Sequence, residues 1–384
     1  MIKVAVIGFG VVGSGVVDMI HDNKNVLNEN TGERIEIKKI LDIREFPDDR
    51  HGFLVTHNAD EIFNDPEIKI VVETMGGTKY AYDYSVRALK AGKHLVTSNK
   101  EMVASHGPEL LKLAKENKVR YMFEASVGGG IPIIGPLSLY LAGNNINEIY
   151  GILNGTTNYI LTQMKETKIS FDEALKEAQE KGYAEANPDA DVKGFDAVRK
   201  IAILASIAYN KFVDYNDLEC EGITQIEAED IRLAEELGYS IKLVGHTRKD
   251  GDKIIAGVRP MLVPKENILS NVNDVFNAIM VKGDFIGQTM FYGKGAGKNA
   301  TASAIIGDIV DIIRNPGVMQ EKVWDIKAAG LGDQEQENAS FFIRYLSDNG
   351  ENCAIITEVR KESEIRKIYC EKYDVKNIFK VLSF

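Results

Sequence analysis

The chain has few cysteines and no long apolar run. Its three cysteines, Cys220, Cys353 and Cys370, share no metal-ligand spacing and cannot form an even disulfide framework, which fits a reducing compartment. No apolar stretch approaches the about 20 residues that a membrane-spanning helix requires. Met1 leads directly into an apolar segment without a basic region, so we expect no signal peptide. These absences predict a cytoplasmic, water-soluble protein.

The chain also has fewer positively charged than negatively charged residues. The 46 lysines and arginines are outnumbered by 57 aspartates and glutamates, which gives a formal net charge of −11. Such a balance disfavours nucleic acid or an anionic membrane as partner. With 44% hydrophobic and 27% charged residues the composition is that of an ordinary globular protein. A chain of 384 residues is long enough for two or three domains of about 100–200 residues.

Histidine is missing between His106 and His246, so a histidine base is not available in the segment that is richest in other ionisable groups. That segment, residues 181–209, begins with a loop containing Glu185, Asp189 and Asp191 and continues into a helical stretch that is apolar in its second half. Charged groups beside an apolar helix must be paired to offset their desolvation. The pattern therefore predicts a polar substrate site.

Within that helical stretch Asp196 and Lys200 lie four residues apart, on one face of the helix. The alternative to a substrate site is an ordinary i,i+4 ion pair at the end of a core helix. The carboxylates in front of the helix favour the substrate site. Tyr183, beside this loop, is expected either to position substrate or simply to pack.

The N-terminus carries a dinucleotide-binding pattern. The apolar run at residues 2–7 has the length of a buried parallel strand and is followed by a G-x-G-x-x-G motif and a helical spacing. The first glycine permits a tight turn, the second lets the backbone approach the pyrophosphate, and the third lets the helix pack on the strand. The helix N-terminus then offers free N–H groups to the phosphates. The predicted cofactor-binding residues here are Gly8, Phe9, Gly10, Val11, Val12 and Gly13.

The choice between NAD and NADP is left open by the sequence. The second predicted strand, residues 35–43, ends near the expected adenosine ribose, where a carboxylate favours NAD and an arginine favours the 2′-phosphate of NADP. Asp42, Arg44 and Glu45 all occur at this point. Any of the three is also compatible with simple solvation.

Strands and helices then alternate up to residue 124, with one of the helices expected at residues 109–117. This alternation predicts an α/β fold with a Rossmann-type doubly wound parallel sheet. Ligands of such folds bind at the carboxyl ends of the strands, where Gly76 and the segment 98–100 are found. We predict an NAD(P)-binding domain at residues 1–130, to which residues 293–325, including Gly297, return. Residues 131–292 are predicted to form an α+β catalytic and dimerisation domain.

The second domain is expected to contain a helix at residues 133–141, a strand at 146–153 and a helix at 159–165, the last capped by Thr156 or Thr157. Alternating runs at residues 240–247 and 253–260 predict an antiparallel pair, extended by strands at 276–282 and 284–292. Residues 335–384 are predicted to form a separate C-terminal module, with strands at residues 340–346, 353–359 and 375–382 and a helix at 362–370.

On these motifs the chain resembles homoserine dehydrogenase from Gly8 to about Asp311. The segments that carry the resemblance include GFGVVG, VVETMGG, HLVTSNKEMVA, FEASVGGGIPII, GILNGTTNYILTQM, GYAEANPDADVKGFDAVRK and YGKGAGKNATASAIIGDI. The resemblance implies reversible hydride transfer between L-homoserine and L-aspartate 4-semialdehyde with NAD or NADP, a step in threonine and methionine biosynthesis. It also implies a homodimer or higher homo-oligomer.

The resemblance assigns roles by motif position. Lys200 is implied as proton donor to the new alkoxide, and Lys100 as a group near the nicotinamide and the reacting carbon. A lysine suits this role because it can protonate developing negative charge on oxygen. The implied substrate-binding residues are Glu185, Asp196, Asp191, Tyr183 and Thr156, and the further implied cofactor-binding residues are Arg44, Gly76, Lys100, Gly182 and Gly297.

The resemblance also implies a monovalent cation site, with sodium held by the Glu124 carboxylate and the carbonyls of Val127, Gly129 and Ile131. Oxygen ligands of this kind suit a hard cation. The alternative is a buried glycine-rich turn with one capping acid. The C-terminal module resembles a shortened ACT domain, so the sequence leaves threonine inhibition undecided.

Two other functions were weighed. A dehydrogenase that oxidises a semialdehyde through an activated cysteine is disfavoured because all three cysteines lie outside the expected active-site segments. A non-catalytic module that senses nucleotide and amino acid would suit a dinucleotide fold with an ACT-like tail. It predicts a damaged catalytic cluster, whereas Lys100, Glu185, Asp196 and Lys200 are all present. Oligomer order, cofactor preference and actual metal occupancy stay open.

Overall fold

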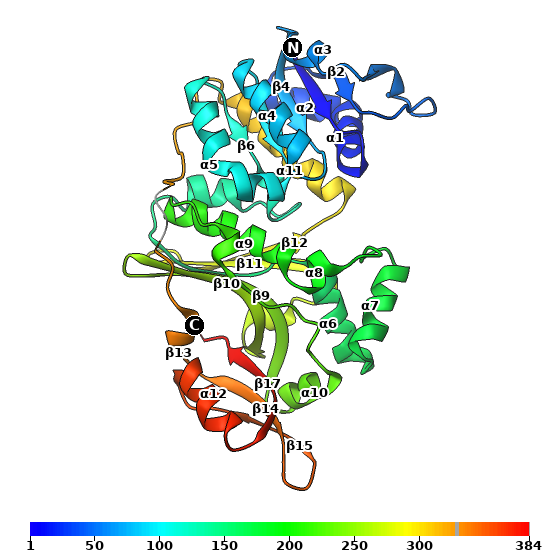
Figure 1. Ribbon diagram of the computed structural model, residues 1–384. Coiled ribbons are helices and arrows are strands. Elements are labelled where there is room, and N and C mark those ends of the chain that lie inside the picture. Colours follow the sequence, from blue (N-terminus) through cyan, green and yellow to red (C-terminus); the bar gives the residue numbers. More distant parts are fainter. Residues whose placement is uncertain (327–329, 384) are drawn as a thin grey trace. The chain divides into compact units, whose positions relative to one another are not determined.

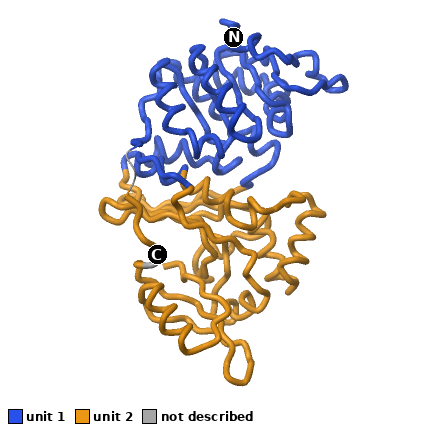
Figure 2. Tube along the Cα trace, in the orientation of Figure 1, with its two compact units in different colours: residues 1–143, 203–215, 294–328 blue, residues 144–202, 216–293, 329–384 orange. Residues whose placement is uncertain are grey.

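The computed structural model describes residues 1–326 and 330–383 and divides the chain into two compact units. Unit 1 comprises residues 1–143, 203–215 and 294–328, and unit 2 comprises residues 144–202, 216–293 and 329–384 (Figure 2). None of the helices in the described part is long and apolar enough to cross a membrane.

Unit 1 is built on a six-stranded sheet in the order β3-β2-β1-β4-β5-β6, with every pair parallel. Its central strand β1 follows from the apolar run at the N-terminus, because Val4, Ala5, Val6 and Ile7 are buried on both faces. The strands are β1 (Ile2–Ile7), β2 (Ile35–Leu41), β3 (Val55–Thr56), β4 (Ile68–Glu73), β5 (His94–Thr97) and β6 (Tyr121–Met122).

Helices flank this sheet and connect its strands (Figure 1). They are α1 (Val11–Asp22), α2 (Lys24–Thr31), α3 (Asp60–Phe63), α4 (Lys79–Lys90), α5 (Lys100–Glu116) and α11 (Lys298–Arg314). The last of these comes from far along the sequence, yet Ile305, Ile306, Ile309 and Ile312 are buried in the core formed by α1 and the first strands. Each such isoleucine contributes about 1.5–3 kcal/mol when fully buried, so this core holds α11 within unit 1.

Two predicted helices differ from the structure. The helix expected at residues 109–117 begins already at Lys100, because Asn99 caps it by accepting a hydrogen bond from Met102 N at 3.1 Å. The helix expected at residues 133–141 is present at residues 134–140, but Pro136–Tyr140 has π-type hydrogen bonding in place of the regular α-helical pattern.

Unit 2 contains a nine-stranded mixed sheet in the order β12-β11-β7-β9-β10-β17-β14-β15, with β8 also paired to β10. The predicted antiparallel pair is confirmed as β9 (Tyr239–Asp250) and β10 (Lys253–Pro264), and the predicted extension is confirmed as β11 (Phe276–Gly283) and β12 (Gly287–Lys294). The remaining strands before the tail are β7 (Ile146–Ile152) and β8 (Glu219–Cys220). The α/β fold class with a Rossmann-type sheet and a second α+β part is thus confirmed.

Helices of unit 2 are α6 (Gly155–Thr167), α7 (Phe171–Glu180), α8 (Asp189–Val192) and α10 (Ala228–Glu236); α9 (Phe195–Tyr209) begins in unit 2 and ends in unit 1. The helix α9 packs closely on the sheet where β9 has Gly245. A Cβ atom at Gly245 would lie 3.3 Å from Ile201 Cβ, so the missing side chain permits the close approach. This contact fixes the start of α9, with Asp196 and Lys200, against the sheet.

The C-terminal strands continue the sheet of unit 2. They are β14 (Phe341–Leu346), β15 (Asn352–Ile356) and β17 (Asp374–Val381), with the helix α12 (Glu362–Cys370) between the last two. A further two-stranded ladder joins β13 (Asn338–Ala339) to β16 (Arg360–Lys361). The predicted elements of the tail are confirmed, and residues 347–351 form the turn of a β14–β15 hairpin.

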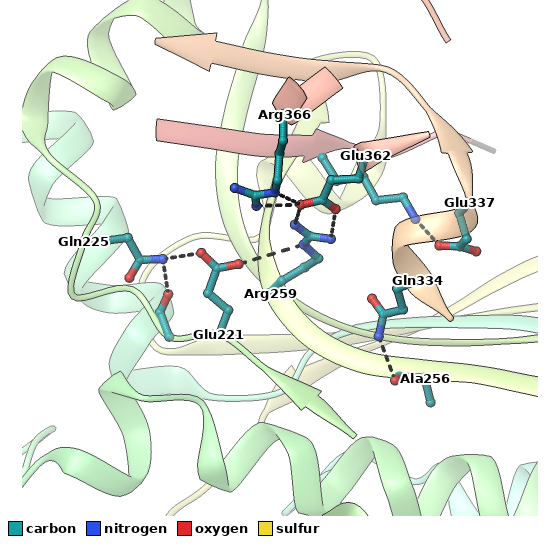
Figure 3. Close-up of polar contacts among 10 residues, drawn as sticks. Glu221, Gln225, Ala256, Arg259, Gln334, Glu337, Glu362 and Arg366 are labelled. Atoms are coloured by element: carbon teal, nitrogen blue, oxygen red, sulfur yellow. Dashed lines mark hydrogen bonds and ion pairs between the residues drawn. The ribbon is translucent and has the colours of Figure 1, made fainter. Parts of the chain in front are cut away.

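A buried ion pair attaches α12 to β10. The guanidinium of Arg259 donates to both carboxylate oxygens of Glu362, at 2.7 and 3.1 Å, and Arg366 approaches the same carboxylate (Figure 3). Both partners of the first pair are almost fully buried, with side-chain exposures of 8% and 4%. The tail is thus held to the main sheet by strand pairing and by buried charge.

Candidate active site

The glycine loop of unit 1 has the geometry of a phosphate cradle. Gly8 has a φ of +91°, which only glycine adopts easily. A Cβ at Gly13 would lie 1.9 Å from the carbonyl oxygen of Gly8, so the start of α1 can pack here only with glycine. By contrast, nothing lies within 4 Å of a Cβ built on Gly10. The loop therefore leaves open space in front of the free N–H groups of α1, where a pyrophosphate fits.

Two of the three residues expected near the adenosine ribose, Asp42 and Arg44, form one cluster with the loop. The Asp42 carboxylate accepts hydrogen bonds from Phe9 N at 2.7 Å, from Arg44 N at 3.0 Å and from the Arg44 guanidinium at 3.0 Å to each oxygen. Burial raises the pKa of Asp42, but these hydrogen bonds outweigh burial and bring the pKa to about 2. The third residue, Glu45, is exposed and pairs with His57.

The carboxylate of Asp42 is thus an anion whose lone pairs are largely used, while the side chain of Arg44 is 59% exposed. Val11 and Val12 form the first turn of α1, and Val11 is 68% exposed beside the loop. Gly297, at the N-cap of α11, has a φ of +115° and open space where a Cβ would stand.

The ends of β4 and β5 carry a connected polar network. Glu73 is fully buried and accepts hydrogen bonds from the Thr97 hydroxyl at 2.6 Å and from Met75 N at 2.7 Å. Burial raises the pKa of Glu73 to about 7. Asn99 donates from its amide to Gly77 O at 2.7 Å. This network holds the glycine turn that contains Gly76, and it places Lys100 as the first residue of α5.

In unit 2 the predicted pair on α9 is present and buried. Lys200 Nζ donates to Asp196 Oδ2 at 2.8 Å and to the carbonyl oxygen of Leu153 at 2.8 Å. The side chains of Lys200 and Asp196 are 9% and 5% exposed. The pair is thus buried rather than solvated as a surface i,i+4 pair would be, and both the substrate site and an ion pair at the end of a core helix are compatible with this burial.

Asn154 joins this pair to the acidic loop. Its amide nitrogen donates to Asp196 Oδ2 at 2.9 Å and to Asp191 Oδ1 at 2.7 Å. Its amide oxygen accepts from Thr157 N at 2.9 Å and thereby caps α6. The expectation that Thr156 or Thr157 caps this helix is wrong, because the Asn154 side chain accepts the hydrogen bond from the free N–H of Thr157.

Asn154 is also the residue of this cluster that the sequence reasoning missed. An asparagine directly before G-T-T is a recognisable N-cap signal, since asparagine is among the strongest capping residues. Its second role, as donor to two carboxylates distant in the sequence, has no local signal.

The other predicted substrate residues lie around this cluster. The hydroxyl of Thr156 donates to Tyr183 O at 2.6 Å and ties the start of α6 to the acidic segment. The ring of Tyr183 packs edge-on against Tyr159, with centroids 5.0 Å apart, and is 44% exposed. The Glu185 side chain is exposed, and its backbone carbonyl accepts a hydrogen bond from Gln179 Nε2 at 3.1 Å. Gly182 has a φ of +74° in the turn before it.

The predicted cation loop lies in unit 1. The Glu124 carboxylate accepts three backbone N–H bonds, from Ile133 and Gly135 at 2.6 Å and from Ile134 at 2.8 Å. Val127, Gly129 and Ile131 are buried in the same turn. Among the residues described, no group of three histidine, cysteine or acidic side chains converges on a point. A carboxylate has about four lone-pair directions, so one remains on Glu124 for a cation held otherwise by carbonyls.

Unit 1 has a glycine loop suited to the pyrophosphate of a dinucleotide, and the same chain carries a buried cluster of carboxylates, an amide and a lysine. Together these features define a nicotinamide-dependent dehydrogenase that acts on a small polar substrate. The comparisons with known proteins identify which one. A family model described as homoserine dehydrogenase matches residues 132–310, and one described as homoserine dehydrogenase, NAD binding domain, matches residues 8–124.

Individual relatives agree. The homoserine dehydrogenase of Bacillus subtilis (strain 168) is 44% identical over 318 residues, which cover 82% of this chain and 73% of the relative. The crystal structure of a homoserine dehydrogenase from Thiobacillus denitrificans has a TM-score of 0.92 at 32% identity, covering 100% of this chain and 98% of the other. A hyperthermophilic archaeal homoserine dehydrogenase mutant in complex with NADPH has a TM-score of 0.69 at 28% identity, covering 81% and 97%.

The chain belongs to the homoserine dehydrogenase family. It is therefore an NAD(P)-dependent oxidoreductase that interconverts L-homoserine and L-aspartate 4-semialdehyde, a reaction of amino-acid biosynthesis. This assignment confirms the resemblance found in the sequence and does not favour the non-catalytic alternative.

Proposed function

We propose that the cluster of Asp191, Asp196 and Lys200 is the part of the chain that binds and protonates the substrate. The observation that carries the proposal is the buried Asp196–Lys200 pair, whose carboxylate is also bonded by Asn154. Homoserine and aspartate semialdehyde both carry an ammonium group, for which Asp191 and Asp196 supply charge-assisted acceptors. Glu185, Tyr183 and Thr156 are proposed to complete the substrate site.

Lys200 is proposed as the group that moves the proton. When the aldehyde is reduced, a hydride adds to its carbon and the Lys200 ammonium gives one proton to the carbonyl oxygen, which yields the alcohol. In the reverse direction neutral Lys200 removes the hydroxyl proton. Burial beside a carboxylate restricts the lysine to one orientation, which such a proton transfer requires. Lys100 is proposed to lie near the reacting carbon.

When bound, the nicotinamide cofactor supplies or accepts the hydride. We propose that Gly8, Gly10 and Gly13 hold its pyrophosphate and that Gly76, Gly182 and Gly297 contact it. For the ribose we propose a preference for NADP. The Asp42 carboxylate accepts from four donor atoms, two of them on the Arg44 guanidinium, while the Arg44 side chain, held in place by these bonds, is 59% exposed. The NADPH complex of the archaeal relative is in line with this choice.

The substrate role of Asp196 is tested by steady-state oxidation of homoserine with wild type and Asp196→Asn. Loss of the carboxylate should raise the KM for homoserine by about 10- to 100-fold, since a hydrogen bond to a charged group contributes about 1.5–3 kcal/mol. The matched control is Asp189→Asn, because Asp189 is half exposed and bonded to Lys193. Equal KM values for the two variants would refute the assignment.

Cofactor preference is tested by comparing kcat/KM for NADP and NAD in wild type and Arg44→Ala. The proposal expects wild type to favour NADP and the variant to lose about 10-fold or more of that preference, because the charge facing the 2′-phosphate is gone. An unchanged ratio in Arg44→Ala would contradict it.

We further propose that a sodium ion binds Glu124 and the carbonyls of Val127, Gly129 and Ile131. The Glu124 carboxylate lies in a turn rich in carbonyl groups and accepts three backbone N–H bonds. One of its lone-pair directions therefore remains for a cation, which supports the proposal. Thermal unfolding in sodium chloride against choline chloride at equal ionic strength should show a higher Tm with sodium, and the difference should vanish in Glu124→Gln.

Three further points are proposals. We propose a homodimer, for which the terminal strand β12 offers an edge with only β11 beside it in the sheet. Light scattering of the purified protein tests it. We also propose that residues 335–384 form a shortened ACT-like module and that the enzyme serves threonine and methionine biosynthesis. The three free cysteines fit a reducing compartment, and cytoplasmic location stays a prediction.

A further inference from the structure

We propose that Asn154 is a positioning residue that holds the two carboxylates of the substrate cluster together and divides the charge of Asp196 between substrate and Lys200. The inference rests on the proposed roles of Asp196 and Lys200. It assigns a function to a residue whose amide nitrogen donates to both Asp191 and Asp196.

The orientation of the Asn154 amide is fixed by its surroundings. The side chain is buried, at 6% exposure. On one side the amide meets the Thr157 N–H at 2.9 Å and the Thr157 hydroxyl at 3.0 Å, and on the other side it meets two carboxylates. Only the oxygen can accept from an N–H, and only the nitrogen can donate to carboxylates. The NH₂ group therefore faces Asp191 and Asp196, with one N–H for each.

This arrangement offsets the repulsion between two nearby acids. Two carboxylates that share one site normally force one of them to take up a proton. A neutral donor bonded to both offsets part of this repulsion and keeps both carboxylates together for the ammonium group of the substrate. Asn154 achieves this without adding a cation that would compete with that ammonium group.

Asn154 also weakens the interaction between Asp196 and Lys200. Asp196 Oδ2 accepts from Asn154 at 2.9 Å and from Lys200 at 2.8 Å, so its charge is shared between two donors. The neighbouring carbonyl of Leu153 takes a second Lys200 N–H at 2.8 Å. Residues 153 and 154 thus orient both members of the pair from one strand end.

The variant Asn154→Asp tests the positioning role of Asn154 while it preserves the helix cap. Aspartate caps a helix as well as asparagine does, so the bond from Thr157 N is retained. The two N–H donors are lost, and a third carboxylate faces Asp191 and Asp196. We expect kcat/KM for homoserine to fall about 10²-fold. The added negative charge stabilises protonated groups nearby, so the pH of half-maximal oxidation should rise by about one unit.

Asn154→Ser is the second variant, because serine also caps but brings no charge. It should lower kcat/KM without the shift in pH profile. The matched control is Asn267→Asp, which changes another capping asparagine of unit 2, bonded to Leu269 N at 2.9 Å. Its activity and pH profile should stay those of wild type. Binding of NADP, measured by fluorescence, should be unchanged in all three.

The outcomes distinguish this inference from the function on which it rests. If Asp196→Asn raises the KM for homoserine and Lys200→Ala lowers kcat while Asn154→Asp keeps the wild-type rate and pH profile, the positioning role is refuted and the site assignment stands. If Asp196→Asn keeps the wild-type KM and Lys200→Ala keeps the wild-type kcat, the proposed site fails. If Asn154→Asp does not fold, an undiminished kcat/KM in Asn154→Ser overturns the inference.

Discussion

Replacing Glu362 by glutamine should destabilise unit 2 strongly, although the residue lies in the C-terminal tail. In the folded protein its carboxylate accepts two hydrogen bonds from Arg259, at 2.7 and 3.1 Å, and two from Arg366, at 3.0 and 2.6 Å (Figure 3). Glutamine keeps the shape but removes the charge and turns one acceptor into a donor. Arg259 would then be a buried cation without its main partner.

The size of the effect follows from burial. Removing one member of a buried ion pair costs about 3–5 kcal/mol, because the remaining charge stays desolvated. Glu221, 4.0 Å from Arg259 and 43% exposed, offsets part of this loss, so we expect about 3 kcal/mol. At about 2–4 °C per kcal/mol for domains of 150–250 residues, Tm should fall by roughly 6–12 °C.

The assay is thermal and urea unfolding followed by circular dichroism. The control is Glu358→Gln, which removes a carboxylate of the same tail whose Arg360 partner is exposed, and it should change stability by less than about 0.5 kcal/mol. Arg259→Leu combined with Glu362→Leu should recover most of the loss, since no unpaired charge remains. Equal stability of the two glutamine variants would refute the reasoning.

The pair also predicts a pH dependence. Burial raises the pKa of Glu362, but the hydrogen bonds and charge of Arg259, with those of Arg366, outweigh it and lower the pKa below its ordinary value. A carboxylate with a lowered folded-state pKa contributes stability above its unfolded pKa of about 4.3, and this stability is lost as pH falls towards the folded value. The difference between wild type and Glu362→Gln should therefore shrink below about pH 4.

Two further predictions concern unit 1. Gly13→Ala should abolish NADP binding, measured by fluorescence titration, because its Cβ would lie 1.9 Å from Gly8 O; retained affinity would contradict the cradle geometry. Glu73→Gln should flatten the pH dependence of unfolding free energy. The pKa of Glu73 is raised to about 7, so its contribution is full below the unfolded value and is lost as pH rises from about 4.5 to 7. The variant should gain up to about 3 kcal/mol over wild type at pH 8, and no gain would show that Glu73 is not held neutral.

Much of unit 1 is readable from the sequence because its signals are local. The apolar run of β1, the glycine spacing and the alternation of strands and helices each act within a few residues. The return of α11 was also predictable, from a glycine-rich loop followed by a helical apolar stripe. The helical segment at residues 134–140 follows from its apolar spacing, whereas the π-type hydrogen bonding of Pro136–Tyr140 has no signal in that spacing.

The substrate cluster was only partly predictable. Asp196 and Lys200 are four residues apart, so their pairing follows from helix geometry. Asn154 bonds residues that are 37 and 42 positions away, and such contacts depend on tertiary packing that no local pattern encodes. The same holds for Arg259 and Glu362, which are 103 residues apart.

The most direct test of the account is the rate of homoserine oxidation by Lys200→Ala compared with Lys193→Ala. Lys193 lies on the same segment but is half exposed and bonded to Asp189, so its loss should leave the rate unchanged. Followed at the nicotinamide absorbance band with saturating cofactor, kcat of Lys200→Ala should fall by about 10² or more, with cofactor affinity intact. Comparable turnover by the two variants would contradict the assignment of proton transfer to Lys200.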